Sequence, residues 1–254
     1  MRAALIPRVR PLLRPLSALL LVVGGLLLID AVVTLVWQEP VSALYSRLQQ
    51  GRLDDKLATL EGTEPTAVDR KVLSRLGSLD RRLAYTARAL DRRTEDGDPL
   101  GRIRMPSIGV SSVVVAGTDT ASLRLGPGHY PGTPLPGARG TVAIAGHRTT
   151  YGAPFRKLDK LSRGDRVEVR MPYGTFSYEV QRTRIVLPTA TRVTRRVAYD
   201  QLVLTACHPL YSAAKRIVVF ARLVDSQPKG NRLDRAPAAR IGRRPHERLS
   251  NWRR

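Results

Sequence analysis

The strongest hydropathy signal in the chain is an apolar run near the N-terminus. Residues 16–37 contain one charged side chain, Asp30. At about 1.5 Å per residue, a helix of this length reaches roughly 33 Å, which is enough to cross a bilayer. Residues 1–15 contain arginines and no acid, so the positive-inside rule puts them in the cytoplasm. The pattern predicts a basic cytoplasmic N-terminus, a single-pass anchor over 16–37 and an extracellular remainder.

A cleaved signal peptide is the alternative for this run, with a tolerable cleavage site at Val41-Ser42-Ala43. Signal peptides usually have an apolar region of about 7 to 15 residues. Because this run is longer, we prefer the anchor. Asp30 lies near its outer end, where an acid at the interface is tolerated.

Residues 38–100 have the pattern of a helical stalk or linker. Pro65 to Asp69 resemble a capping box that opens a helix. Apolar residues then recur at spacings of four and three, interrupted by Thr86: Val72, Leu76, Leu79, Leu83 and Leu90. This stripe is too short for a coiled coil. We expect it to pack on the following domain or to fill the gap to the membrane, with self-association as the alternative.

From residue 101 onward the pattern changes to short strands between Gly/Pro turns. The predicted strands are 102–105, 110–116, 140–145, 166–171, 175–186, 202–206 and 217–224. A short helix is expected at 155–161. Short strands without long alternating helices predict a mainly β domain over 101–225, built as an antiparallel barrel or sandwich.

The last segment, 226–254, is strongly basic and has no apolar periodicity, so we expect a disordered tail. The whole chain has a formal net charge of +22, which raises the question of nucleic-acid binding. Much of that excess lies in the two ends, aromatic residues make up only 5% of the chain, and no zinc-finger or RNP signature is present. We therefore exclude nucleic acid and expect the tail to meet anionic lipid headgroups or wall polymers.

The number of cysteines limits the kinds of site that this chain can form. The chain has one cysteine, which excludes an internal disulfide and a cysteine-rich zinc site. The glycines near residues 126–140 are interleaved with prolines, unlike a phosphate-binding loop. No metal-ligand spacing stands out, so the sequence predicts no cofactor and no metal.

That single cysteine, Cys207, follows the apolar run Leu202 to Leu204, and Arg216 opens the next one. Both runs are short and β-branched, as in buried strands. If the two strands pair as neighbours, the thiol and the guanidinium face one cleft. A reactive thiol needs a base or cation and a donor for a developing oxyanion. A buried, inert cysteine is the alternative.

Of the four histidines, His147 has the best context for such a base. It follows the apolar segment Val142 to Ala145 and so lies at a strand end, as Cys207 does. His208 is adjacent to the thiol, but neighbouring strand residues point to opposite faces. For His129, in a Gly/Pro-rich loop, and for His246, in the tail, we expect a solvated role.

These segments resemble the sortases, membrane-anchored cysteine transpeptidases of Gram-positive bacteria. The resemblance lies in GHRTTYGAPF, in LTACHP and in Arg216, and it covers roughly 101–224. The GPGHYPGTPLPG loop and the WQEP segment are most similar to the class E housekeeping type. The resemblance implies a closed sortase-type β-barrel. One departure is Ala206, where the family usually has threonine before the cysteine, which puts in doubt a hydroxyl contact to substrate from that position.

The resemblance also implies roles for individual residues. Cys207 is expected to attack a backbone carbonyl, Arg216 to stabilise the oxyanion, and His147 to exchange protons with the leaving and entering amines. The substrate cleft is expected to involve Tyr130, Tyr151, Thr205 and Tyr211, with plain packing as the alternative for the three tyrosines. The Tyr130 hydroxyl would accept the alanine N–H of the signal, which a proline lacks.

The implied substrate is the C-terminal sorting signal of a secreted protein, Leu-Ala-x-Thr-Gly, cut between Thr and Gly. The acyl group would pass through a thioester to a peptidoglycan amine, from lipid II or mature wall. Leu-Pro-x-Thr-Gly specificity, pilin polymerisation and hydrolysis stay open.

Three different protein classes compete with the sortase interpretation. They are an L,D-transpeptidase-like wall enzyme, a papain-like hydrolase and a non-catalytic membrane-tethered module with a buried Cys207. The two enzyme classes fit poorly, because the residues before Cys207 and the order of cysteine and histidine along the chain differ from theirs.

Overall fold

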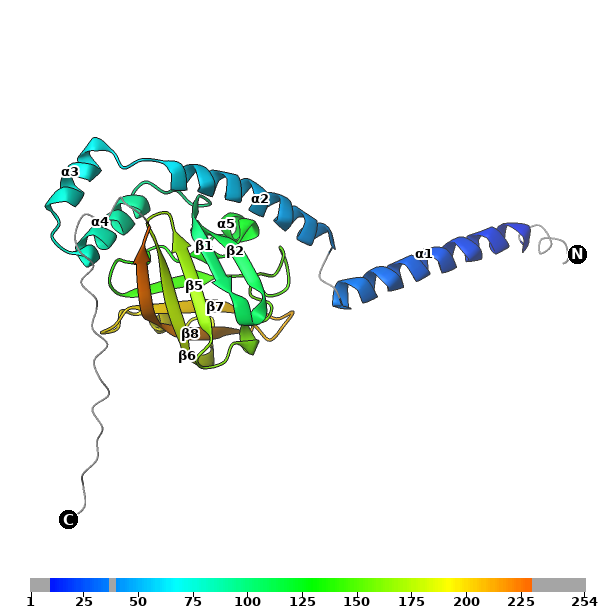
Figure 1. The fold of residues 1–254 in the computed structure, drawn as a ribbon. Coiled ribbons are helices and arrows are strands. Elements are labelled where there is room, and N and C mark those ends of the chain that lie inside the picture. The colour runs from blue at the N-terminus through cyan, green and yellow to red at the C-terminus, as the bar shows by residue number, and fades with distance from the viewer. Residues whose placement is uncertain (1–9, 37–39, 230–254) are drawn as a thin grey trace, which may run out of the picture.

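The structure, a computed structural model, describes residues 10–36 and 40–229 (Figure 1). Residues 1–9 of the expected cytoplasmic end (1–15), and residues 230–254 of the expected basic tail with His246, lie outside the described residues. The helices are α1 (Arg10–Val36), α2 (Pro40–Gly62), α3 (Ala67–Arg75), α4 (Leu79–Asp91) and α5 (Thr120–Leu125), with 3-10 turns η1 (Pro106–Ile108), η2 (Leu158–Lys160) and η3 (Thr191–Thr194).

The strands form a closed barrel. They are β1 (Pro99–Met105), β2 (Val110–Ala116), β3 (Gly128–His129), β4 (Thr141–Ala145), β5 (Arg166–Met171), β6 (Gly174–Val186), β7 (Gln201–His208) and β8 (Lys215–Pro228). Their order around the barrel is β1-β2-β3-β4-β7-β8-β6-β5. The pairs β2–β3 and β4–β7 are parallel, and the other pairs are antiparallel. The predicted closed β-barrel is confirmed, with mixed parallel and antiparallel pairing.

Two local predictions were less accurate. The strand β3 lies inside the Gly/Pro-rich loop and was missed, because two residues give no alternation to detect. The helix expected at 155–161 is a single 3-10 turn, η2. The strand predictions at β2 and β5 match the observed bounds.

Alternation along the strands separates an inner from an outer face. In β7, Leu202, Leu204 and Ala206 point into the main core, while Val203 belongs to a separate cluster on the outer face. Each of these side chains is buried. Burial on both faces explains why the run before Cys207 is continuously apolar rather than alternating.

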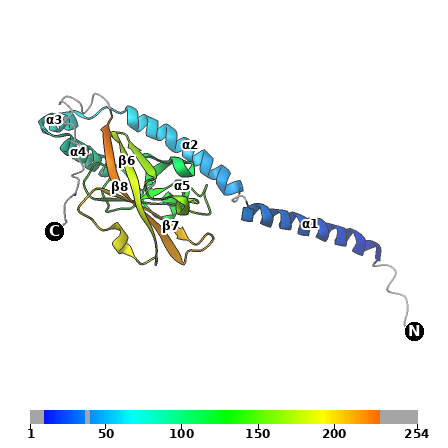
Figure 2. The same cartoon turned by 60° about the horizontal axis from the view of Figure 1, so that its bottom comes forward.

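The helix α1 contains a stretch, Arg14–Val33, that is long and apolar enough to cross a membrane. None of that stretch is buried against the rest of the protein, and Figures 1 and 2 show α1 extending away from the barrel. An apolar helix this exposed to water would be unfavourable. The finding fits a membrane anchor or a signal sequence.

The helix α2 lies along the barrel over β1, β2 and α5 (Figures 1 and 2). Leu53 and Leu57 bury their side chains against Val113 and Val115 on the outer face of β2. The Gln50 side chain accepts from the Val113 N–H at 2.7 Å and donates to the Leu125 carbonyl at 2.8 Å. The stalk expected from the sequence therefore packs on the barrel.

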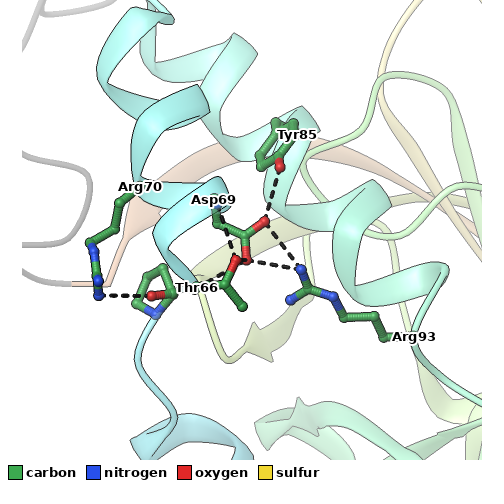
Figure 3. A network of polar contacts seen from close by, with 6 residues as sticks. Thr66, Asp69, Arg70, Tyr85 and Arg93 are labelled. Atoms are coloured by element: carbon green, nitrogen blue, oxygen red, sulfur yellow. Dashed lines mark hydrogen bonds and ion pairs between the residues drawn. The ribbon is translucent and has the colours of Figure 1, made fainter.

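The helices α3 and α4 are joined by a polar network around Asp69 (Figure 3). The predicted capping box is present, with Thr66 and Asp69 bonding reciprocally. Tyr85 donates to the carboxylate at 2.9 Å and Arg93 pairs with it at 2.9 Å. The Thr66 side chain first, and Arg93 and Tyr85 with it, hold the pKa of Asp69 far below its usual range. This network lines a cavity of about 440 Å³ between the helices and the barrel. The Asp69 carboxylate in its wall already accepts hydrogen bonds from Thr66, Tyr85 and Arg93.

Candidate active site

Cys207 lies near the C-terminal end of β7, directly opposite Arg216 on β8. Residues opposite each other in an antiparallel pair point to the same face. Leu204 and Ala206 point inward, so Cys207 and Arg216 share the outer face. The predicted pairing of these two strands is therefore present. The thiol is partly exposed and free.

The outer face below the thiol forms a regular grid across β6, β8, β7 and β4. The row at Cys207 contains Val186 and Arg216. The next row contains Arg184, Val218, Thr205 and Ala145. The third contains Arg182, Phe220, Val203 and Ala143. The centre of this grid, the apolar floor formed by Val203, Val218 and Phe220, is buried, and arginines lie along its β6 side.

His147 lies two residues beyond the end of β4. This strand runs parallel to β7 with Ala145 opposite Thr205, so His147 and Cys207 each follow that pair by two residues. The imidazole and the thiol therefore leave neighbouring strands at the same end of the barrel. The His147 ring packs against Tyr151, with the ring centroids 5.3 Å apart.

Burial, followed by the positive charge of Arg124, lowers the pKa of His147 below its usual 6.5. Its Nε2 atom is buried and makes no hydrogen bond within the described part of the chain. Both effects favour the neutral imidazole at neutral pH. A neutral imidazole is ready to accept a proton from an entering nucleophile.

Arg216 bonds its own loop. Its Nη1 donates to the carbonyls of Ala213 at 2.9 Å and Lys215 at 3.0 Å. These bonds orient the guanidinium beside the Cys207 row, and the fork has further N–H donors for another acceptor. A guanidinium held in this way can stabilise an oxyanion that forms at a carbonyl attacked by the thiol.

Arg148 has a position that the sequence analysis missed. It is 2% exposed, and its Nη2 pairs with Asp159 at 2.9 Å. Its Nη1 donates to the Cys207 carbonyl at 3.3 Å and contacts His208 Nδ1 at 3.2 Å. The same guanidinium donates to the Arg156 carbonyl. One side chain thus connects the His147 loop to the end of β7.

The residues expected to contact substrate lie at three places around the thiol and the imidazole. Tyr130 and Thr205 lie together, with their hydroxyl oxygens 2.9 Å apart, beside the row that precedes Cys207. Tyr151 packs on His147, and also meets Tyr45 of α2 edge to face at 6.4 Å. Tyr211 follows Cys207 in the β7–β8 loop and accepts a hydrogen bond from Arg156 at 3.2 Å.

Two expectations change with the structure. Ala206 points into the core and is 4% exposed, so the substitution at this position affects packing and not the face on which the thiol lies. His129 is not solvated, because it is 4% exposed and contacts Thr133 and the Pro134 carbonyl. It anchors the β3 loop from inside.

A thiol, an imidazole and a guanidinium at one end of a closed barrel make up a constellation suited to acyl transfer through a cysteine nucleophile. Among the described residues, no group of three or more His, Cys, Asp or Glu side chains is arranged to hold a metal ion. The fold and the site together define a β-barrel protein of the cysteine acyl-transfer class.

Comparison with known proteins gives the family. The model of the sortase domain matches residues 103–224. Sortase D of Bacillus subtilis is 33% identical over 134 residues, which cover 51% of this chain and 66% of that protein. The chain spans 43 to 62% of the length of the other curated relatives that it matches.

Among solved structures, one shares the fold and a second is similar in sequence. The SrtF sortase from Corynebacterium diphtheriae superposes with a TM-score of 0.51 at 29% identity, over 57% of this chain and 93% of that one. Sortase E from Streptomyces avermitilis is 33% identical over 55% of this chain and 99% of that one, with a TM-score of 0.49. The chain belongs to the sortase family of cysteine transpeptidases.

Proposed function

We propose that this protein is a membrane-anchored sortase that cuts a C-terminal sorting signal of secreted proteins and transfers them to a peptidoglycan amine. The observation that supports it most directly is the strand register. Cys207 lies opposite Arg216, and His147 follows the parallel strand on the other side. Cys207 is the proposed nucleophile, Arg216 the oxyanion donor and His147 the proton carrier.

In the first half-reaction, the neutral His147 imidazole accepts the proton of the Cys207 thiol and becomes the imidazolium, and the thiolate adds to the scissile carbonyl carbon of the donor. The Arg216 guanidinium donates to the oxyanion, a contact typically worth about 3–4 kcal/mol. The carbon–nitrogen bond then breaks, the departing amine takes a proton from the His147 imidazolium, and a thioester remains.

In the second half-reaction, the acceptor amine attacks the thioester carbon. A carbon–nitrogen bond forms, the carbon–sulfur bond breaks, and Cys207 leaves as thiolate. The neutral imidazole of His147 accepts the proton of the attacking amine. The lowered pKa of His147 favours this step, because more of the ring is neutral.

The proposed donor signal is Leu-Ala-x-Thr-Gly, cut between Thr and Gly. The apolar floor of Val203, Val218 and Phe220 is itself buried, and the partly exposed Tyr130 and Val186 that pack on it present an apolar surface that suits such a signal. Tyr130 packs against this floor, and its hydroxyl already pairs with Thr205. We assign these two side chains, with Tyr151 and Tyr211, to the walls of the cleft. Sortase D and sortase E proteins both occur among the relatives, and the class E assignment is part of the proposal.

For localisation, we propose that residues 16–37 anchor the protein with its N-terminus in the cytoplasm. The apolar, unpacked stretch of α1 supports an anchor. The domains we propose are a basic N-terminus over 1–15, the anchor, a helical linker over 38–100, the catalytic domain over 101–225 and a basic tail over 226–254. The barrel itself begins with β1 at Pro99 and ends with β8 at Pro228, so it extends a few residues past both expected bounds of the catalytic domain.

The test is mass spectrometry on the full chain in detergent micelles with Leu-Ala-x-Thr-Gly and Leu-Pro-x-Thr-Gly peptides and triglycine. The expected result is a ligated product, faster with the alanine peptide, and none with Cys207→Ala. Hydrolysis alone would instead identify a cysteine hydrolase. If neither peptide is cut and Cys207 resists iodoacetamide in the folded protein, the non-catalytic alternative replaces this proposal.

A further inference from the structure

A cavity of about 420 Å³ opens beside the His147 loop. It is bounded by α2, by the turn between β1 and β2, and by residues 151–157. None of the apolar floor residues of the outer face lines it. The cavity therefore lies beside the surface that we assign to the sorting signal and shares only Tyr151 with it.

The charged side chains that line this cavity are mostly cationic. They are Arg47, Arg102, Arg156 and Lys157, against the single acid Asp54. Asp54 is ion-paired with Arg102. Arg47, Arg156 and Lys157 therefore face the cavity with no carboxylate among the lining residues to neutralise them. An uncompensated cluster of this kind attracts anions.

Arg156 lines the cavity with a guanidinium that has donors to spare. Its Nη2 donates to the Tyr211 hydroxyl at 3.2 Å. Its Nη1 is enclosed by protein atoms and makes no hydrogen bond within the described residues, so a ligand would meet the rest of the fork. A guanidinium has five N–H donors and pairs especially well with phosphate.

The cavity adjoins the proposed catalytic groups on the His147 side. Tyr151 lines it and packs on the His147 ring at 5.3 Å. Arg156 connects its wall to Tyr211, in the loop that follows Cys207. A ligand anchored here by an anionic group can extend an amine past Tyr151 toward the imidazole.

The cavity is also near the membrane end of the domain. The helix α1 ends at Val36 and α2 begins at Pro40. Arg47 is seven residues further on, which is about 10 Å along the helix axis. An acceptor whose phosphate is held near a bilayer surface could therefore reach this cavity.

We propose that this cavity is an anion subsite that binds a phosphate group of the amine acceptor through Arg47, Arg156 and Lys157. The inference rests on the proposed function and names the substrate class of its second half-reaction. Binding the phosphate places the amine at the thioester. The carbon–nitrogen bond then forms, the carbon–sulfur bond breaks and the amine proton passes to His147.

The experiment is a competition between two amines that differ only in the phosphate, O-phosphoethanolamine and ethanolamine, as acceptors for the full chain in detergent micelles. The ratio of the two products is measured in one reaction, so a general loss of activity cancels. We expect the phosphorylated amine to be preferred about tenfold, the effect of one to two charge-assisted hydrogen bonds. The variant Arg47→Gln/Lys157→Gln should bring the ratio close to one, as should Arg156→Gln.

The matched control is Arg52→Gln, which removes an exposed cation of α2 that does not line the cavity and should keep the preference. Equal transfer to both amines, or a ratio that the variants leave unchanged, would overturn the subsite. Glycine and glycinamide as acceptors test a carboxylate in the same way. If the protein prefers glycine over glycinamide but does not prefer O-phosphoethanolamine over ethanolamine, the assignment of the subsite to phosphate is overturned.

Two further measurements separate the sources of phosphate and the two proposals. The full chain in vesicles that contain phosphatidylethanolamine tests whether the phosphate can come from a lipid-linked acceptor. Preferred transfer to the phosphate-bearing amine over ethanolamine, in micelles or in vesicles, supports the subsite. Mass spectrometry of the Cys207 adduct tests the first half-reaction. If no thioester forms, the proposed function fails; if it forms and ethanolamine reacts equally well, only the subsite fails.

Discussion

At the scale of single residues, Arg148 is the most constrained polar side chain near the proposed nucleophile. It is almost completely buried, and its ion-pair partner, Asp159, is 40% exposed. Its hydrogen bonds end on main-chain carbonyls at Cys207 and Arg156. Because no contact with a reacting atom is involved, we regard Arg148 as a positioning residue.

Replacing Arg148 by methionine should lower kcat for transpeptidation by about 10- to 100-fold, because small displacements of reacting groups have effects of this size. KM for the donor peptide should change little, and Arg148→Lys should recover part of the loss. The check is steady-state kinetics beside the rate of Cys207 alkylation by iodoacetamide. A positioning role predicts that alkylation falls much less than transfer.

The second variant is Asp159→Asn, which removes the negative charge paired with Arg148 but leaves the hydrogen bonds of Arg148 to the Cys207 and Arg156 carbonyls in place. It should lower kcat by less than Arg148→Met does. It keeps the prediction testable if Arg148→Met does not fold. Full activity of a folded Arg148→Met protein would show that the guanidinium does not position the site.

The pKa of a single residue, His147, should set how the rate of amine transfer depends on pH. The positive charge of Arg124, after burial, lowers the pKa of His147. In Arg124→Gln this repulsion is absent, so the pKa of His147 rises. The neutral imidazole then appears only at higher pH, and the acid limb of the rate of amine transfer should move to higher pH. Arg163→Gln, in an exposed loop, should leave the limb in place, and an unmoved limb in Arg124→Gln would contradict the assignment of His147 as base.

At the scale of elements, the helix α2 is part of the folded domain and not a spacer. Its buried leucines and Gln50 fasten it to the outer face of β2. Its first turns place Tyr45 against Tyr151, which packs on His147. The segment between α1 and the barrel is therefore in contact with the proposed active site.

We expect Leu53→Ala to reduce the free energy of unfolding by about 2–4 kcal/mol, because it removes a buried leucine and leaves a cavity. Leu48→Ala, at a position that is 61% exposed, should change it by less than about 0.5 kcal/mol. Urea unfolding of the full chain in detergent measures both. If both variants change the free energy of unfolding by the same small amount, α2 is not packed stably on the barrel.

Elements also show how far the sequence alone leads. Alternation and β-branched runs were enough to find β2, β5 and the Cys207–Arg216 hairpin, and the spacing of Thr66 and Asp69 indicated the start of α3. These signals are local. The parallel pairing of β4 with β7, the short β3 and the contacts of Arg148 depend on residues far apart in the chain, which no local pattern encodes.

At the scale of the whole molecule, two partly or fully buried histidines make stability depend on pH. Burial is the main cause that lowers the pKa of His129 and of His147 below 6.5. In the unfolded chain histidine titrates near 6.5. Below that pH the unfolded chain binds more protons than the folded one, so the folded state loses stability as the pH falls toward the lowered pKa values.

We therefore expect Tm to be constant above about pH 7 and to fall between about pH 6.5 and 5, before most carboxylates titrate. Thermal unfolding of the full chain in detergent measures this. The variant His129→Gln should flatten the dependence on pH, and a Tm that is independent of pH across this window would contradict it.

The parallel pairing of β4 with β7 has a consequence for the timing of activity. The proposed base follows β4, whereas the nucleophile and the oxyanion donor come from a hairpin about sixty residues later in the chain. The hairpin alone contains a thiol without its imidazole. The proposed catalytic groups therefore come together only when β7 and β8 have taken their places between β4 and β6, so a chain whose barrel is not yet closed would lack the complete site.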